Sequence, residues 1–193
     1  NENFSTSPPL SLYGASKLSS ENLALEYGEN FDFPVWINRC GVMAGAGQFG
    51  RADQGIFSYW IHSFREKRPL EYIGFGGSGF QVRDVMHPKD LEPLLWKQMN
   101  NPSAETPKVL NLGGGVQNSM SLNQLTSWCE KHLGPNDVIA SQIERPMDAP
   151  WIVMDSSLAE EAWDWKPQTK INDILNEIAR HADSYPQWLN ATN

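Results

Sequence analysis

Hydrophobic and polar residues follow two different periods along the chain. Apolar positions that recur every three to four residues predict amphipathic helices. We expect three of them over 14–28, 54–66 and 88–100. Three more should begin at Ser121, end at about Trp163 and begin after Thr169. Short apolar runs between turn residues predict strands, which we expect at 33–38, 70–75, 80–86, 108–115, 137–143 and 151–155. Helices that alternate with strands in this way are typical of an α/β fold.

Several residues predict where the helices begin and end. Ser121 and Gln124 have the spacing of a capping box. Asp155 and Thr169 are candidate N-caps of the last two helices, and Gly28 is a candidate stop for the first. The final helix should bury one apolar face, made of Ile171, Ile174, Leu175, Ile178 and Ala182.

Glycine marks two segments that we expect to be irregular. Residues 41–50 contain four glycines and are predicted to form a loop. Residues 74–79 lie between two strand-like segments, which favours a tight turn. A dinucleotide-binding glycine motif follows a first strand and opens a helix, and no segment of this sequence has that arrangement.

Composition excludes several classes of protein. The chain has 193 residues, of which 40% are hydrophobic and 20% charged, and this is typical of a globular protein with a sizeable core. The net charge of −8 argues against a nucleic-acid partner, because non-specific binding needs a basic face. No apolar run approaches the roughly 18 residues of a membrane span, so we expect no membrane partner and a cytoplasmic location.

The cysteines and histidines indicate neither a disulfide framework nor a metal site. Cys40 and Cys129 lack a CxxC spacing, and the four histidines are scattered. We therefore expect both cysteines to stay reduced and to behave as small hydrophobic residues. The chain begins with Asn-Glu-Asn instead of Met, which suggests a fragment of a longer protein.

Tyr13 and Lys17, in "LYGASK" at 12–17, are the first candidates for chemistry. On a helix, side chains four residues apart lie on one face. A phenol with a pKa near 10 needs a shift of about 3 units, or about 4 kcal/mol, to be half-ionised at pH 7. A lysine charge 4 Å away supplies about 1 kcal/mol in water and about 4 at an effective dielectric of 20. The pair is therefore an acid–base couple only inside a water-poor cleft, and a solvated surface helix is the alternative.

The motifs that follow this pair resemble one family. Arg39 precedes "GVMAGAGQFG", and farther along come "GFQVRDVMHPKDL", "NLGGG" and "ERPMD". In this order they resemble the extended short-chain dehydrogenase/reductase family, in particular its NAD-dependent nucleotide-sugar epimerases and dehydratases. The stretches "QFGRADQG" and "YIGFGGSGFQVRDV" are most similar to the branch typified by the CDP-paratose and CDP-tyvelose 2-epimerases. The resemblance extends over nearly all of residues 3–185.

This resemblance implies a fold and a division into domains. The chain would be the carboxy-terminal part of a Rossmann-like doubly wound sheet, joined to a smaller α/β substrate-binding domain. Residues 1–50 would be the remnant of the NAD-binding domain. Residues 51–193 would belong mainly to the substrate-binding domain, with some segments returning to the Rossmann part. The family's amino-terminal half, which carries the GxxGxxG motif, is not in this sequence.

The resemblance also implies roles for individual residues. Tyr13 would move a proton on a sugar hydroxyl, and Lys17 would hold the nicotinamide ribose. Residues near the NAD cofactor would be Tyr13, Lys17, Arg39, Cys40 and Val42, and those near the substrate would be Gln48, Gln81, Arg83, Arg145 and Asp148. Arg83 and Arg145 would clamp a pyrophosphate, for which guanidinium groups are well suited.

Some of these roles have structural alternatives. Arg83 would otherwise form an ion pair with Asp84 or Asp90, Arg145 would lie on the rim, and Gln81 would alternate outward on its strand. The sequence departs from the family pattern at Val42, Ala44, Ala46 and Met147, among other positions, where the family has Asn or Cys, Tyr, Pro and Gly.

The activity implied is inversion of a sugar carbon in a nucleotide-diphosphate sugar, by transient hydride transfer to bound NAD with Tyr13 as acid–base. The alternatives are a 4,6-dehydratase or reductase of the same family, or a non-catalytic domain that binds nucleotide or a protein partner. By analogy with the family, the expected assembly is a homodimer.

Overall fold

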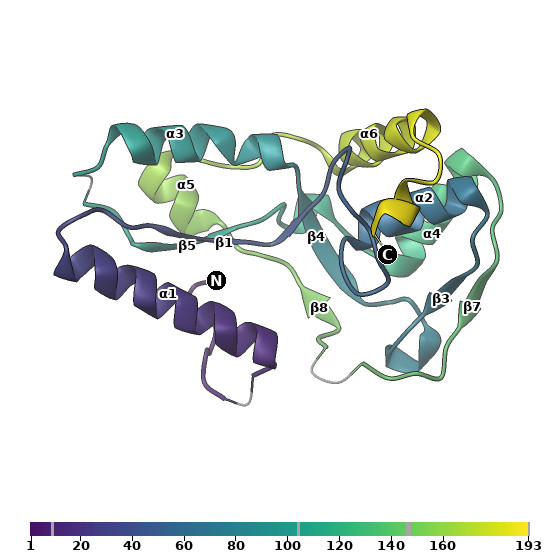
Figure 1. Ribbon diagram of the computed structural model, residues 1–193, viewed down its shortest axis with the longest axis horizontal. Coiled ribbons are helices and arrows are strands. Elements are labelled where there is room, and N and C mark those ends of the chain that lie inside the picture. Colours follow the sequence, from purple (N-terminus) through teal and green to yellow (C-terminus); the bar gives the residue numbers. More distant parts are fainter. Residues whose placement is uncertain (9, 104, 146–147, 193) are drawn as a thin grey trace.

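Helices and strands alternate along the whole chain in the computed structural model, which describes residues 1–8, 10–103, 105–145 and 148–192 (Figure 1). Met147, one of the departures from the family pattern, lies outside the described residues. The strands are β1 (Ile37–Cys40), β2 (Val42–Met43), β3 (Leu70–Tyr72), β4 (Val82–Met86), β5 (Val109–Leu112), β6 (Ser119–Ser121), β7 (Val138–Ala140) and β8 (Trp151–Ile152). The α-helices are α1 (Leu12–Asn30), α2 (Ile56–Glu66), α3 (Glu92–Asn100), α4 (Leu122–Leu133), α5 (Ser157–Trp163) and α6 (Ile171–Ser184).

The strands form three small sheets in which most pairings are parallel. Strands β1 and β5 pair in parallel, as do β3 and β7. Strand β4 lies between β2 and β6, pairing in parallel with β2 and antiparallel with β6, and β8 also pairs with it. The α/β fold class expected from the sequence is confirmed.

Two hydrophobic cores lie on either side of β4. One is built from α2, α4 and α6 and includes Trp60, Phe64 and Leu175. The other includes Met86, Leu110 and Trp163, and Figure 1 shows α3 and α5 on one side of the β1–β5 pair and α1 on the other. Burial of one such large apolar side chain contributes roughly 1.5–3 kcal/mol, so these two clusters hold the layers together.

The first strand begins later than the sequence indicates. We expected it at 33–38, but pairing with β5 begins at Ile37, whose N–H donates to the carbonyl of Lys108 at 2.7 Å. Phe33 is still tied back to the end of α1, because its N–H donates to the carbonyl of Gly28. The loop expected at 41–50 also contains β2, and there the expectation was wrong: Val42 pairs with Val85.

Gly28 lies inside α1 and does not end it. The helix continues to Asn30, and Gly28 is buried. A Cβ at this position would lie 2.7 Å from Cγ2 of Val35. Glycine is therefore needed because the chain that returns after the helix packs directly against the helix backbone.

The predicted start of α4 is confirmed and that of α6 is not. Ser121 and Gln124 form a capping box, with the Gln124 N–H 3.1 Å from Ser121 Oγ. The N-cap of α6 is Lys170, because Thr169 has another partner: its hydroxyl donates to Asp90 at 2.8 Å in the interior. The N-cap of α5 is Ser156 and not the predicted Asp155, although Asp155 accepts a hydrogen bond from the N–H of Ser157 at 3.0 Å.

The sequence did not predict β6, but the remaining elements agree with their expected positions within a few residues. The predicted helix at 88–100 is a 3₁₀ turn at Pro88–Asp90 followed by α3. Most of the observed strands are shorter than the apolar runs that predicted them. Within the described ranges, no helix has the length and apolar character that crossing a bilayer requires.

Candidate functional site

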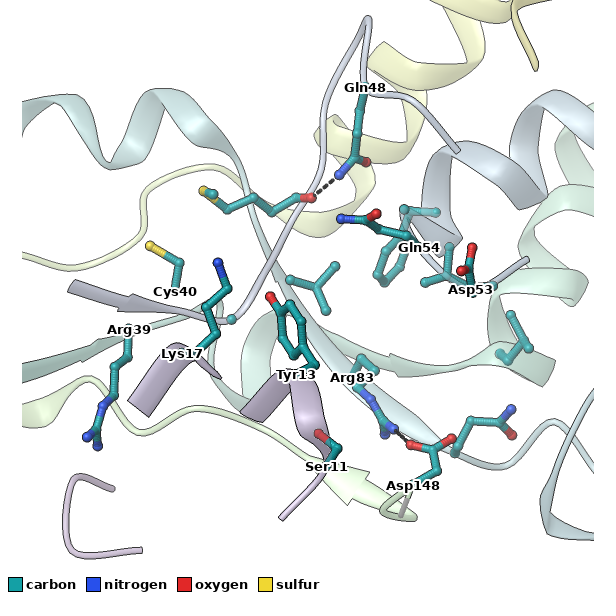
Figure 2. Close-up of a pocket in the computed structure, with 18 of the residues that line it drawn as sticks. Ser11, Tyr13, Lys17, Arg39, Cys40, Gln48, Asp53, Gln54, Arg83 and Asp148 are labelled. Atoms are coloured by element: carbon teal, nitrogen blue, oxygen red, sulfur yellow. Dashed lines mark hydrogen bonds and ion pairs between the residues drawn. The ribbon is translucent and has the colours of Figure 1, made fainter. Parts of the chain in front are cut away.

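A cavity of about 1130 Å³ opens between α1 and the face formed by β2, β4 and the first turns of α2 and α4. Figure 2 shows Tyr13 and Lys17 projecting from α1 on one side of this cavity, with Gln48, Asp53 and Gln54 on the other. All ten candidate residues line it, namely Tyr13, Lys17, Arg39, Cys40, Val42, Gln48, Gln81, Arg83, Arg145 and Asp148. The fold thus brings together side chains that are distant in the sequence, such as Tyr13 on α1 and Asp148 before β8.

Tyr13 and Lys17 face the same way from the first turns of α1. The helix begins at Leu12 because Ser11 Oγ accepts a hydrogen bond from the N–H of Gly14. The Lys17 ammonium lies 5.4 Å from the centroid of the Tyr13 ring. Tyr13 is 71% exposed, so the described residues do not supply the water-poor surroundings that an acid–base couple requires.

Arg39 holds α1 against β1. Its guanidinium donates to both carboxylate oxygens of Glu21, at 2.6–3.1 Å. This bidentate geometry is the strong form of an arginine–carboxylate pair, and hydrogen bonding to Glu21 raises the pKa of Arg39. The side chain lines the cavity while its charge is engaged with α1, so Arg39 fixes the position of the helix that carries Tyr13.

Cys40 and Val42 form an apolar part of the wall. Cys40 is half-buried and packs against the core beneath β1, and burial raises the pKa of its thiol. Cys40 and Cys129 are both free cysteines. In the described part of the chain, no cluster of three His, Cys, Asp or Glu residues is arranged to hold a metal ion.

Gln48 and Gln81 line the cavity, and each has a buried side-chain oxygen. The Gln48 side-chain nitrogen donates to the carbonyl of Met43 at 2.6 Å, which fixes the orientation of the amide (Figure 2). Its Oε1, like that of Gln81, is buried and has no hydrogen-bond partner among the described residues. A buried acceptor without a partner costs free energy, so neither amide is fully satisfied by the described residues.

Arg83 pairs with Asp148, and the two structural partners considered for it were wrong. Its guanidinium donates to Asp148 Oδ1 at 2.5 Å, and both side chains are half-buried. Asp84 instead accepts from the N–H of Gly115, and Asp90 accepts from Thr169. Burial is the largest influence on Asp84 and raises its pKa.

Arg145 lines the same cavity as Arg83 but is exposed. The aliphatic part of its side chain packs over Gly74, 3.5 Å from the position of a Cβ there. The positive φ of Gly74, 78°, is a conformation that suits glycine. The turn at 74–79 therefore supports an arginine at the mouth of the cavity.

Sequence reasoning missed Asp53 and Gln54, which line the cavity just before α2. Gln54 pairs with Arg51 in an isolated β-bridge, and Gly55 has a φ of 71° at the N-cap of the helix. The signal available in the sequence was a pair of polar residues, Asp53 and Gln54, directly before a glycine at the start of a helix. It is weak because the same pattern is common in solvent-exposed turns.

The NAD dependent epimerase/dehydratase family matches residues 1–113, which is more than half of the sequence. The chain therefore belongs to this family. It is 30% identical to CDP-paratose 2-epimerase of Salmonella typhi over 86% of its own length and 50% of the relative's. It is 25% identical to a probable dTDP-glucose 4,6-dehydratase of Sinorhizobium fredii over 86% of its own length and 47% of the relative's.

Solved structures show the same fold. UDP-glucuronic acid 4-epimerase from Bacillus cereus, crystallised with UDP-glucuronic acid and NAD, matches with a TM-score of 0.78 and 26% identity. The match covers 92% of this chain and 54% of that one. The chain thus spans about half the length of the relatives it matches, and its architecture is that of a Rossmann-like epimerase.

Proposed function

We propose that this chain is the carboxy-terminal part of an NAD-dependent nucleotide-sugar epimerase. The observation that carries the proposal is the convergence of Tyr13, Lys17 and Arg83 on one cavity. In this reading, residues 1–50 belong to the NAD-binding domain and most of 51–193 to the substrate-binding domain. The match to CDP-paratose 2-epimerase supports a nucleotide-diphosphate sugar as substrate.

The substrate would lie across the cavity with its diphosphate at the arginines. Arg83 and Arg145 supply two positive charges to an anion in a chain whose net charge is −8. Guanidinium groups bind phosphate oxygens through paired hydrogen bonds. The side-chain amides of Gln48 and Gln81, which line the cavity, would then form hydrogen bonds with hydroxyl groups of the ligand.

The residues present fit one end of NAD. Between Tyr13 and Lys17 lie three small residues that let a flat ring approach α1, and Cys40 and Val42 offer an apolar surface. Lys17 would hold the ribose hydroxyls. NAD, when bound, supplies the acceptor and donor of hydride. The pyrophosphate of NAD has no glycine-rich cradle in this sequence.

Tyr13 would carry the proton chemistry of the reaction. Its phenolic oxygen would take a proton from one sugar hydroxyl and later return it. The Lys17 charge favours the ionised phenol only where water is excluded. Because Tyr13 is largely exposed in these 193 residues, further protein and the bound ligands would have to close the cavity.

A 4,6-dehydratase is the second candidate, favoured by the similarity to the probable dTDP-glucose 4,6-dehydratase. Both reactions begin with removal of a hydroxyl proton and hydride from a sugar carbon. They differ in the acids and bases that act afterwards. Assay of product sugars by chromatography separates the two.

Calorimetry with NAD, CDP-glucose and UDP-glucuronic acid tests the proposal. We expect no measurable binding of NAD to the 193-residue chain and no epimerisation by it, because one wall of the cofactor site is not in the sequence. The chain extended by the segment encoded upstream should bind NAD and interconvert a nucleotide sugar. Tight binding of NAD by the 193 residues alone, or no nucleotide binding by either protein, would contradict the proposal.

A further inference from the structure

The loop between β2 and α2 forms the wall of the cavity at Gln48. It contains Gly45, Gly47 and Gly50, and Gly47 has a φ of 75°. A loop this rich in glycine loses much conformational entropy when it is ordered. Contacts with other parts of the fold must therefore hold it in one position.

Glu177 of α6 supplies such a contact in the middle of the loop. Its Oε1 accepts the N–H of Ala46 at 2.9 Å and lies 3.0 Å from Nε2 of His87. The other ring nitrogen of His87 accepts the N–H of Lys89 at 3.0 Å, so Nε2 carries the hydrogen and donates it to Glu177. One carboxylate oxygen therefore joins α6, the loop and the end of β4.

The carboxylate of Glu177 is ionised in this arrangement. Burial alone would raise its pKa, but the hydrogen bonds from Ala46 and His87 and the charge of Lys89 outweigh burial and lower it. Hydrogen bonds to a charged acceptor are roughly twice as strong as neutral ones. The contact at Ala46 is consequently a strong one.

A second anchor holds the loop two residues farther on. The main-chain oxygen of Gln48 accepts from Ser58 Oγ at 2.7 Å and from Trp188 Nε1 at 3.1 Å. With both anchors in place, the side-chain nitrogen of Gln48 reaches the carbonyl of Met43 and its Oε1 is left without a protein partner. Gly45 is required because a Cβ there would lie 2.9 Å from His87 Nε2.

We propose that Glu177 is a positioning residue that holds the loop so that the Gln48 side chain stays in the wall of the cavity where the sugar of the ligand would lie. Glu177 itself is not among the described residues that line the cavity, so it acts through the loop. The identity of the ligand in this inference rests on the proposed function. The position of the loop rests on the structure alone.

Hydrogen exchange on the 193-residue chain tests the position of the loop. Glu177→Ala should speed exchange of the Ala46 amide about tenfold relative to Glu161→Ala, a control at an exposed position of α5. Glu177→Gln should restore part of the protection, because an amide oxygen still accepts the Ala46 N–H. Equal exchange at Ala46 in all three variants, or an equal increase at Ile178 inside α6, would overturn the proposal. If Glu177→Ala does not fold, the isosteric Glu177→Gln is compared with Glu161→Gln. Exchange at Ala46 should then be faster in Glu177→Gln, and equal exchange in the two variants would overturn the proposal.

Ligand binding tests the link to Gln48. UDP and UDP-glucose serve as probes in calorimetry, since they differ by the sugar alone. In Glu177→Ala the affinity for UDP-glucose should fall about tenfold while that for UDP changes by less than about twofold. Equal losses for the two probes would overturn the role of Gln48. If neither the unmodified chain nor its upstream-extended form binds UDP, CDP or their glucose conjugates, the proposed function fails, while the exchange measurement still tests the position of the loop.

Discussion

At the scale of single residues, the guanidinium of Arg83 is oriented by the protein itself. Asp148 holds one nitrogen at 2.5 Å, and the carbonyl of Val82 accepts from another at 2.7 Å. Orientation of this kind lowers the entropic cost of binding an anion. The same ion pair leaves Asp148 as a negative charge beside the proposed diphosphate, so the two residues have opposite effects on binding.

Arg83→Ala should therefore weaken the binding of UDP or CDP. A lost hydrogen bond to a charged group costs about 1.5–3 kcal/mol, or roughly 10- to 100-fold in the dissociation constant, and the unpaired Asp148 adds repulsion. Titration calorimetry measures this change. The matched control is Arg65→Ala, which removes an exposed arginine paired with Asp183 at 2.9 Å outside the cavity. Similar affinities in the two variants would refute a role for Arg83 in anion binding.

At the scale of elements, the capping box of α4 links helix stability to the cavity. Ser121 and Leu122 line the cavity at the point where the helix begins. The Ser121 N–H donates to the Gln124 side chain at 2.8 Å, and Ser121 Oγ accepts in return. The local sequence pattern thus sets the position of one wall.

Ser121→Ala should lower the free energy of unfolding by about 1 kcal/mol, because an N-cap hydrogen bond of α4 is lost. Urea denaturation followed by tryptophan fluorescence measures the change. Ser127→Ala, at an exposed position of the same helix where the hydroxyl donates to the carbonyl of Asn123, is the control. We expect a change within about 0.5 kcal/mol there. A loss at Ser121 no larger than at Ser127 would mean that the cap does not stabilise the fold.

At the scale of the whole molecule, a buried histidine couples stability to pH. His62 is 1% exposed, and its Nε2 lies 3.3 Å from Nδ1 of His181, which joins α2 to α6. Burial, with the charges of His181 and Arg68, lowers the pKa of His62 to about 4. Burial also lowers the pKa of His181. Both groups therefore favour the neutral form in the folded protein.

The free energy of unfolding should fall as the pH drops from about 6.5, the ordinary histidine pKa, toward about 4. In this window the unfolded chain binds a proton at His62 that the native state does not, and above it the full stability is retained. The loss due to this residue is at most about 3 kcal/mol. Denaturation at a series of pH values should show a smaller slope for His62→Phe than for wild type. His132→Phe, at an exposed histidine, should keep the wild-type slope, and parallel slopes for wild type and His62→Phe would contradict the argument.

The sequence by itself determined the features that depend on local spacing. The pairing of Tyr13 with Lys17, the capping box at Ser121 and the buried face of α6 all follow from helix geometry, which relates residues three or four apart. These were predicted and are present in the structure. The motifs that identified the family are likewise short stretches of contiguous sequence.

Only the tertiary structure decided which distant residues meet. The partner of Arg83 is Asp148 rather than a neighbouring acid, Thr169 is drawn from a capping position to Asp90, and β1 begins where β5 can pair with it. Each of these contacts depends on how two layers pack, and no local pattern records the identity of the remote partner. The limits of strands depend on burial, and the choice of ion-pair partner depends on which acceptors compete for the same donor. Both therefore follow from the tertiary structure and not from the local sequence.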